Sequence, residues 1–243
     1  RDRRAENDVA SAASLEEKLR SQGWDGEFTT KSGIKHQVKK LNRLKRRAVS
    51  GRDKTWAEYE TRVSFLVDCG YLAEDLSFNA GARVLSEVQI QEMFTTELVL
   101  GGYFEGMDVE LLFGVLCGMC AELPRGVSVP ESRMYKSLGR RIAQVQGSEV
   151  VVAAEELTGL PTTWDHQLIV IGRWWAEGRA LGEILDQIIS PTDISGSLVG
   201  AFRRAKDLAG QLRQVWRDED PERATELREL IRSVSRDEVE VVS

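Results

Sequence analysis

Apolar and polar positions alternate with helical spacing along much of the chain. In SGSLVGAFRRAKDLAGQL, the segment from Ser195 to Leu212, the apolar residues at 198, 202, 205, 209 and 212 share one helical face. The tail segment PERATELRELIRSV places apolar residues at 227, 230, 231 and 234 on a similar stripe. These patterns predict a long helix near residues 196–215 and a second amphipathic helix after it.

Caps and helix breakers divide the rest of the chain into shorter helices. Asp108 caps VELLFGVLCGMC, Pro130 begins PESRMYKSLGRRIAQVQG, and Gly178 ends TWDHQLIVIGRWWAEG. We expect further helices in SLEEKLRSQG from Ser14, from Ile34 onwards with a bend around residues 50–51, in DKTWAEYETRVSFLVDCG, near residue 80, in IQEMFTTELVLGG and in RALGEILDQI. The segment YLAEDLSFN has some strand character.

These elements predict an all-α fold with little or no strand. A helical bundle over residues 57–243 is preceded, over residues 1–56, by a polar segment and a long, basic, stalk-like helix. In DKTWAEYETRVSFLVDCG, helical spacing gives one face to Trp56, Tyr59, Val63, Leu66 and Val67, and Gly70 ends the helix.

The charge of the chain is unevenly distributed. The net charge is −6, but residues 31–52 hold nine Lys and Arg and no acid, which leaves about −15 on the rest. A basic segment on an acidic body is typical of a chain that meets a polyanion locally, although such runs are also found on solvated helix faces. The expected nucleic-acid contacts there are Lys39, Lys40, Arg43, Lys45, Arg46 and Arg47.

The sequence offers little that supports catalysis. It has no G-x-x-x-x-G-K-[ST] phosphate loop and no G-x-G-x-x-G, and its two histidines, His36 and His166, accompany no nucleophile motif. Cys117 and Cys120 have half the spacing of a zinc site, but on an apolar helix they are better explained as two core thiols. We expect no catalytic residue, no metal and no cofactor in this chain.

The cellular setting follows from cysteine use and hydropathy. The chain has 243 residues and three cysteines, without the spacing of secreted disulfide frameworks. No apolar run reaches the ~18 residues of a membrane span. The start RDRRAENDVA lacks Met and a signal core, and indicates a piece of a longer polypeptide. We expect a cytoplasmic protein with no membrane partner.

Three stretches together resemble a known family. They are RVSFLVDCGYLAEDLSFNAGARVLSEV, TTELVLGGYFEGMDVELLFGVLCGMCAEL and IGRWWAEGRALGEILDQIISPTDISGSLVGAFRRAKDLAGQL, and they contain in order G-Y-L, G-x-R-V-L-x-E, T-E-L-V-x-x-G-x-F, W-x-x-G and G-S-L-V-x-x-F-R-R. Over roughly residues 57–235 the chain is similar to the DSHCT domain. This is the C-terminal helical domain of DExH-box RNA helicases of the superkiller and exosome-cofactor type and of their bacterial relatives.

The resemblance implies a non-catalytic domain of an ATP-dependent helicase. In that family, RecA-like domains of the same polypeptide use ATP and Mg, and the helical bundle closes a ring around single-stranded RNA during unwinding, processing or decay. Single-stranded DNA is an alternative ligand, and a cooperating nuclease is a further expected partner. One bundle helix, the ratchet helix, contacts the strand, and its pattern matches residues 196–204 of this chain.

Within that pattern, Arg204 matches the arginine that reaches the strand in the family, and Glu122 matches an acidic position near the channel. Relatives often have a basic residue at the position of Gly200, so contact there is expected to be weaker or through backbone. Helical geometry alone places Gly200, Arg204 and Gln211 within about 40° of one another, away from the apolar stripe. Arg203 projects about 100° from Arg204 and is the weaker candidate contact, with an ion pair to Asp207 as its alternative.

Two other functions remain open from the sequence. RALGEILDQI, a turn and GSLVGAFRR are compatible with a helix-turn-helix, which makes a stand-alone DNA-binding regulator the alternative function. Against it, the second helix begins with small and apolar residues where base-reading side chains are needed. A protein-interaction scaffold that uses the tail helix is the third interpretation. Glu97, in an apolar run, is expected to be a structural polar partner.

Overall fold

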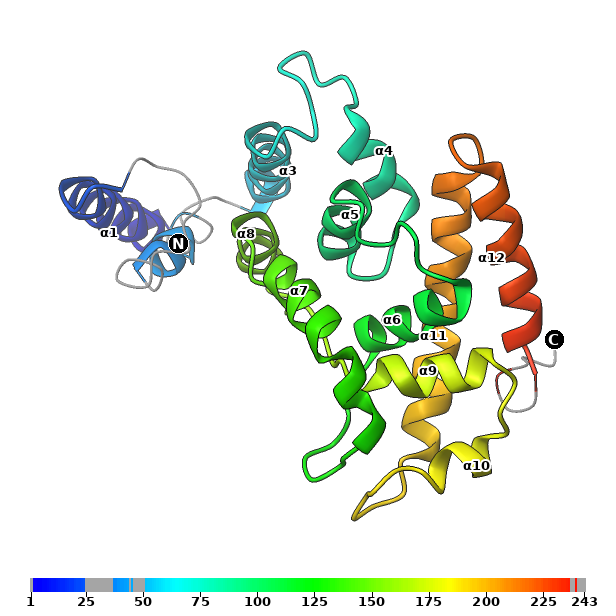
Figure 1. The fold of residues 1–243 in the computed structure, drawn as a ribbon. Helices are drawn as coiled ribbons and strands as arrows, with labels where there is room; N and C mark the ends of the chain where they lie inside the picture. Colours follow the sequence, from blue (N-terminus) through cyan, green and yellow to red (C-terminus); the bar gives the residue numbers. More distant parts are fainter. Residues whose placement is uncertain (1, 25–36, 44, 46–50, 237–238, 240–243) are drawn as a thin grey trace. The chain divides into compact units, whose positions relative to one another are not determined.

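The computed structural model describes residues 2–24, 37–43, 45, 51–236 and 239, and the side chains of residues 11–24, 37–43, 45, 56–236 and 239. The helices are α1 (Asp2–Ser21), α3 (Gly51–Asp68), α4 (Ala80–Glu87), α5 (Glu92–Leu100), α6 (Val109–Cys120), the 3-10 helix η1 (Pro130–Tyr135), α7 (Lys136–Gln146), α8 (Glu149–Thr158), α9 (Leu168–Ala176), α10 (Leu181–Leu185), α11 (Ser195–Trp216) and α12 (Pro221–Val234) (Figure 1). The described residues contain no strand, only the isolated bridges Leu72–Phe78 and Ser128–Ile189. The expected all-α fold is confirmed.

The chain forms two compact units. The first comprises residues 1–79 and 148–160, and the second comprises residues 80–147 and 161–243. The division expected at residue 57 on the basis of composition and resemblance stays a prediction.

In the first unit, α1 packs on a helical segment at residues 37–43. The small core between them contains Ala12, Leu19, Trp24, Val38 and Leu41, all buried. Helix α1 begins at Asp2, well before the expected start at Ser14, because the alanines and glutamate upstream favour helix and Ala12 packs in this core.

Two features of the first unit are not evident from the sequence. Trp56 and Tyr59 on α3 are 62% and 52% exposed, whereas Phe65 is buried, so the packed face of α3 is centred on Phe65. The two exposed rings lie 5.3 Å apart, and the Trp56 indole donates to Glu60 on the same helix. Helix α8 was not expected, because its run of valines lacks a clear helical period, although Ser148 caps its start.

In the second unit, α6 and α9 cross so closely that their backbones touch. A Cβ atom at Gly114 of α6 would lie 2.1 Å from the carbonyl oxygen of Ile169 on α9. A Cβ atom at Gly172 of α9 would lie 2.8 Å from the Cα of Gly114 and 2.7 Å from the Cys117 sulfur. Small residues on both helices therefore permit a crossing that any larger side chain would block.

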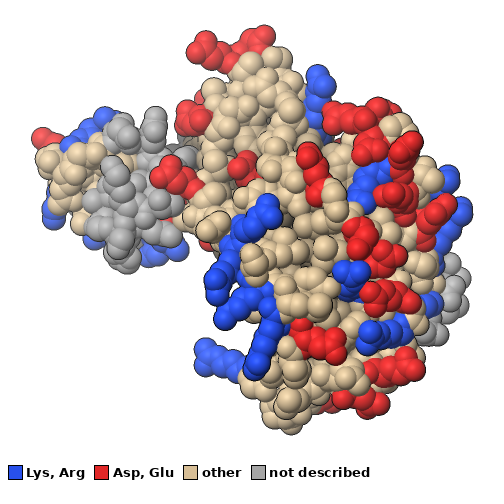
Figure 2. Space-filling model, in the orientation of Figure 1, with Lys and Arg blue, Asp and Glu red and all other residues tan. Residues whose placement is uncertain are grey.

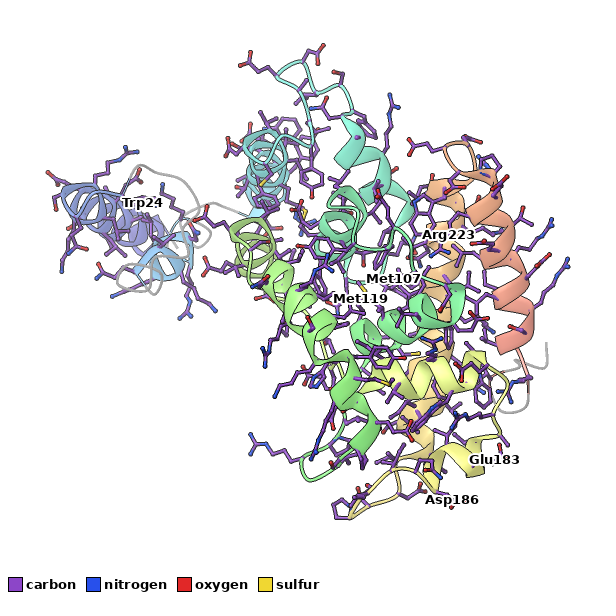
Figure 3. All side chains as sticks on the ribbon, in the orientation of Figure 1. Trp24, Met107, Met119, Glu183, Asp186 and Arg223 are labelled. Carbon is purple, nitrogen blue, oxygen red and sulfur yellow. The ribbon has the colours of Figure 1, made fainter. Side chains whose placement is uncertain are left out.

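Helices α11 and α12 pack side by side against this pair (Figure 1). The apolar face predicted for α11 is confirmed, because Leu198, Ala201, Phe202, Ala205, Leu208, Ala209 and Leu212 are buried. Phe202 stacks on Trp175 of α9 with ring centroids 4.8 Å apart. Arg223 of α12, labelled in Figure 3, extends from α12 toward the backbone oxygen of Phe104. The long helix α11 thus has one buried face, packed on its neighbours, and one face that is not buried.

Candidate nucleic-acid interface

The outer face of α11 holds Arg204 next to a bare stretch of helix backbone. The Nε of Arg204 donates a 2.8 Å hydrogen bond to the carbonyl oxygen of Cys120, the last residue of α6. A Cβ atom at Gly200 would meet nothing within 4 Å except the Nη1 of Arg204, at 3.8 Å. Gly200, which costs about 1 kcal/mol relative to alanine in a helix, therefore leaves room beside the guanidinium. Gly200 and Arg204 lie together, as helical geometry requires.

Apart from this contact, Arg204 is an exposed residue. Among the residues that the structure describes, Cys120 provides its hydrogen-bond acceptor, and that bond uses Nε alone. Arg204 is exposed as a residue, and no described residue accepts a hydrogen bond from either Nη group. An exposed arginine held at one nitrogen, with its other donors unused within the described chain, is suited to phosphate or to stacking on a base.

The hydrogen bond from Arg204 stabilises the C-terminal end of α6. The last carbonyls of a helix lack intrahelical donors and carry partial negative charge, which a cation stabilises. Ala121 is in an extended conformation, so α6 stops abruptly at Cys120. Burial raises the pKa of the Cys120 thiol to about 12, although the charge of Arg204 acts in the opposite direction. Arg204 is therefore also a structural residue, which the sequence alone did not indicate.

Gln211, the third residue of the expected polar strip, has a partner elsewhere. Its Oε1 accepts a 2.8 Å hydrogen bond from the backbone N–H of Gln89, between α4 and α5. Gln211 is half-buried, and this bond ties α11 to the α4–α5 connection. Its oxygen is therefore engaged within the protein, while Gly200 and Arg204 lie farther toward the start of the helix.

The other residues of the expected site lie as follows. Glu122 is exposed and follows the end of α6, two positions after the Cys120 carbonyl that Arg204 contacts. Arg203 is exposed on α11 and has an interaction of its own within the chain. Glu97 on α5 is half-buried and likewise interacts within the chain. Glu122 and Arg204 thus lie at the same helix end, and no ion pair joins them in the described part of the chain.

Gln91 positions the end of α6 and is not among the residues expected from the sequence. Its side chain donates to the backbone oxygens of Met119 and Thr163 and accepts from the N–H of Thr163. Met119, labelled in Figure 3 near the end of α6, is fully buried. Gln91 itself has a left-handed backbone with φ 52°. The strain of that conformation is maintained by three hydrogen bonds between segments remote in sequence. A glutamine before a helix gives no local signal of such a role.

The buried cysteines and His166 have structural surroundings. Cys117 is fully buried at the α6–α9 crossing, and burial raises the pKa of its thiol well above the ordinary value. His166 packs against the backbone of Gly139 on α7. No group of three potential metal ligands occurs among the residues for which the structure gives a placement. The interpretation of Cys117 and Cys120 as core thiols is confirmed by their burial.

The basic segment is only partly described. Lys39, Lys40 and Arg43 lie exposed on the helical segment that packs on α1, whereas Lys45 pairs with Glu16 at 2.5 Å and lowers the pKa of that carboxyl. Arg46 and Arg47 lie outside the described residues. The described part of the segment, residues 37–43 and 45, is therefore helical, with Val38 and Leu41 buried and the cations exposed, and one of these cations is paired.

Comparison with known protein families identifies the family of this chain. It matches the family described as DSHCT (NUC185) domain over residues 75–241, well over half of its length. The chain belongs to this family of helicase-associated, non-catalytic C-terminal domains. No curated protein matches it. None of the described helices has the length and apolar character needed to cross a lipid bilayer.

Proposed function

We propose that this chain guides single-stranded RNA through the ring of an ATP-dependent RNA helicase during unwinding for RNA processing or decay. In this proposal α11 is the helix that contacts the strand, with Arg204 as its principal contact and the bare backbone at Gly200 beside it. The RecA-like domains that hydrolyse ATP belong to the same polypeptide and lie outside this chain. The proposed setting is the cytoplasm.

The observation that carries the proposal is the placement of Arg204. Its Nε is fixed on the end of α6, the residue as a whole is exposed, and no described residue accepts a hydrogen bond from either Nη group. A guanidinium fixed in this way loses little further freedom when it binds a phosphate. Family membership supports the rest, because DSHCT domains are associated with helicases.

A helix-turn-helix regulator fits the geometry less well. Helices in that motif are joined by a turn of roughly three or four residues. Here α10 ends at Leu185 and α11 begins at Ser195, so the connection is much longer. The first turn of α11 is also built from small residues, without side chains that could read bases.

The proposal is tested in the helicase that carries this domain, with Arg204→Ala compared with Arg203→Ala. We expect Arg204→Ala to reduce the rate of RNA unwinding about tenfold, since a charge-assisted contact is worth roughly 1.5–3 kcal/mol. Basal ATP hydrolysis should stay nearly unchanged, because the ATP site lies in other domains. Arg203→Ala should have a smaller effect on unwinding.

Loss of stability must be separated from loss of contact in this comparison. Gly210→Ala, added to each variant, should offset the lost stability. It raises the helix propensity of α11 at a position where a Cβ meets nothing within 4 Å. If Arg204→Ala with this second change unwinds normally, or if both arginine variants lose activity equally, the proposed role of Arg204 is wrong.

A further inference from the structure

A second basic surface lies on η1 and α7, and neither the family pattern nor the proposed contact on α11 includes it. From Arg125 to Arg141 the chain has five Lys and Arg and one acid, Glu131, in a body that is otherwise acidic. In Figure 2, blue side chains gather over the part of the second unit where α7 lies, whereas red and blue mix over α12. We call Arg133, Lys136, Arg140 and Arg141 the α7 basic face.

The cations of this face form a row. On α7 the buried side consists of Gly139, Ile142 and Val145, and Lys136 and Arg140 lie on the opposite side, one turn apart. Arg133 is exposed on η1, directly before the helix. At 1.5 Å per residue, Lys136 and Arg140 are separated by about 6 Å along the axis, so the row follows the helix.

Within the described part of the chain, three of these cations have no charged partner. Among the described residues, none of Arg133, Lys136 and Arg140 forms an ion pair or a side-chain hydrogen bond. Arg141 lies over the Tyr103 ring, with 5.6 Å between its guanidinium carbon and the ring centroid. Exposed cations left unpaired on an acidic protein are available for an external anion.

The surface also presents apolar area among the cations. Met134, next to Arg133, is 70% exposed, and Tyr103 is half-buried under Arg141. A cationic row with exposed flat or polarizable side chains is the combination that single-stranded nucleic acids require, since they offer regular phosphates and unpaired bases. An acidic peptide would use the charges but would leave this apolar surface without a matching partner.

Hydrogen bonds hold the α7 basic face in place. The loop with Trp164 and Asp165 contacts both α7 and the end of α6 that Arg204 contacts. Arg173 of α9 donates to the Tyr135 hydroxyl at the end of η1 and to Asp108. The Trp164 indole donates to the Gly139 oxygen of α7, and the N–H of its neighbour Asp165 donates to the Gly118 oxygen near the end of α6. The end of α6 that Arg204 contacts and α7 are therefore bound to one loop.

We infer that the α7 basic face is a second binding surface for the phosphate backbone of a single-stranded nucleic acid. Its affinity is independent of sequence and sensitive to salt, because it consists of exposed cations without a base-reading array. The inference rests on the proposed function for the identity of the ligand, and its residues are separate from Arg204.

The test uses the full chain and a fluorescein-labelled oligouridylate, with binding followed by anisotropy at several salt concentrations. The variant is Arg133→Gln with Lys136→Gln and Arg140→Gln. The matched control is Arg217→Gln with Arg228→Gln and Arg232→Gln, three exposed cations near or on α12. We expect the α7 variant to flatten the slope of log affinity against log salt by about 0.7 per lost contact, and the control to leave the slope unchanged.

The outcomes separate this inference from the proposed function. If the α7 variant binds like wild type while Arg204→Ala weakens binding, the inference fails and the role of α11 stands. If the wild-type chain does not bind the oligouridylate, both fail. If the α7 variant keeps its RNA affinity but loses affinity for a labelled polyglutamate that the wild-type chain binds, the face serves an acidic protein and the inference is overturned. Thermal melts of both triple variants check that they fold.

Discussion

At the scale of single residues, Arg204 has a structural role at the end of α6 and a proposed role in binding the strand. Its Nε donates a hydrogen bond to the Cys120 carbonyl at the end of α6, and the residue as a whole is exposed. A residue with a structural bond and a free outer edge is held ready for a ligand, since part of its side-chain entropy is already lost on folding. The same bond makes the residue matter for stability.

Arg204→Ala should therefore lower the free energy of unfolding of the chain by about 1 kcal/mol, because a net contribution of this size is typical of one hydrogen bond. Arg228→Ala is the control, since Arg228 is an exposed arginine on α12 and its removal should cost less than about 0.5 kcal/mol. Urea denaturation of both variants measures the difference. Equal stabilities would show that the Cys120 contact contributes nothing.

The position of Arg204 on the unburied face of α11 could be predicted from the sequence, but its hydrogen bond to Cys120 could not. The helical period puts Arg204 opposite the buried side of α11, and the structure agrees. Cys120 lies 84 residues away, and the contact depends on where two helices meet. Gln91 went unnoticed for the same reason, because its acceptors Met119 and Thr163 come together only in the folded chain.

At the scale of elements, four glycines inside helices fall into two physically different groups. Gly114 and Gly172 lie where α6 and α9 touch, and a side chain there would overlap backbone. On α11, a Cβ atom would meet nothing within 4 Å at Gly210 and only the Nη1 of Arg204, at 3.8 Å, at Gly200. Composition does not distinguish these groups, since each glycine is found within a helical pattern.

Gly114→Ala should destabilise the chain by more than about 2 kcal/mol, because the added methyl would lie 2.1 Å from the Ile169 oxygen and would separate α6 from α9. Gly210→Ala should stabilise the chain by about 0.5–1 kcal/mol, since nothing lies within 4 Å of the added atom. Thermal and urea unfolding check both values. A destabilised Gly210→Ala together with a tolerated Gly114→Ala would mean that the helix crossing described here is wrong.

Most elements were predictable from the pattern of the chain, and the exceptions have physical causes. Amphipathic helices such as α11 and α12 were found because one face repeats over several turns. Helix α8 was missed because its valines favour strand and give no polar face, so its helical state depends on packing and on Ser148. The exposure of Trp56 was not foreseen, because aromatic residues at helical spacing are usually buried.

At the scale of the whole molecule, positive charge is concentrated in a few places on an acidic chain. The basic segment at residues 31–52 contrasts with a charge of about −15 elsewhere. Within its described part, Lys39, Lys40 and Arg43 are exposed on a helix whose other side packs on α1. The described part of the segment thus packs on a folded helix and leaves these three cations exposed.

Replacing Lys39, Lys40 and Arg43 with glutamine should weaken binding of single-stranded RNA and flatten its salt dependence, by up to about 0.7 in slope for each lost contact. Lys45→Gln should do less, because Lys45 already pairs with Glu16. Anisotropy titrations over a range of salt concentrations measure the slopes. An unchanged slope for the triple variant would show that this segment is a solvated helix face without a role in binding.

The central claim is that α11 contacts the strand, and crosslinking tests it most directly. The full chain is bound to single-stranded RNA that contains 4-thiouridine, irradiated, digested and analysed by mass spectrometry. We expect crosslinked peptides from the part of α11 around Gly200 and Arg204, and their loss in Arg204→Ala but not in Arg228→Ala. Crosslinks confined to α10 or α12, with α11 unmodified, would contradict it.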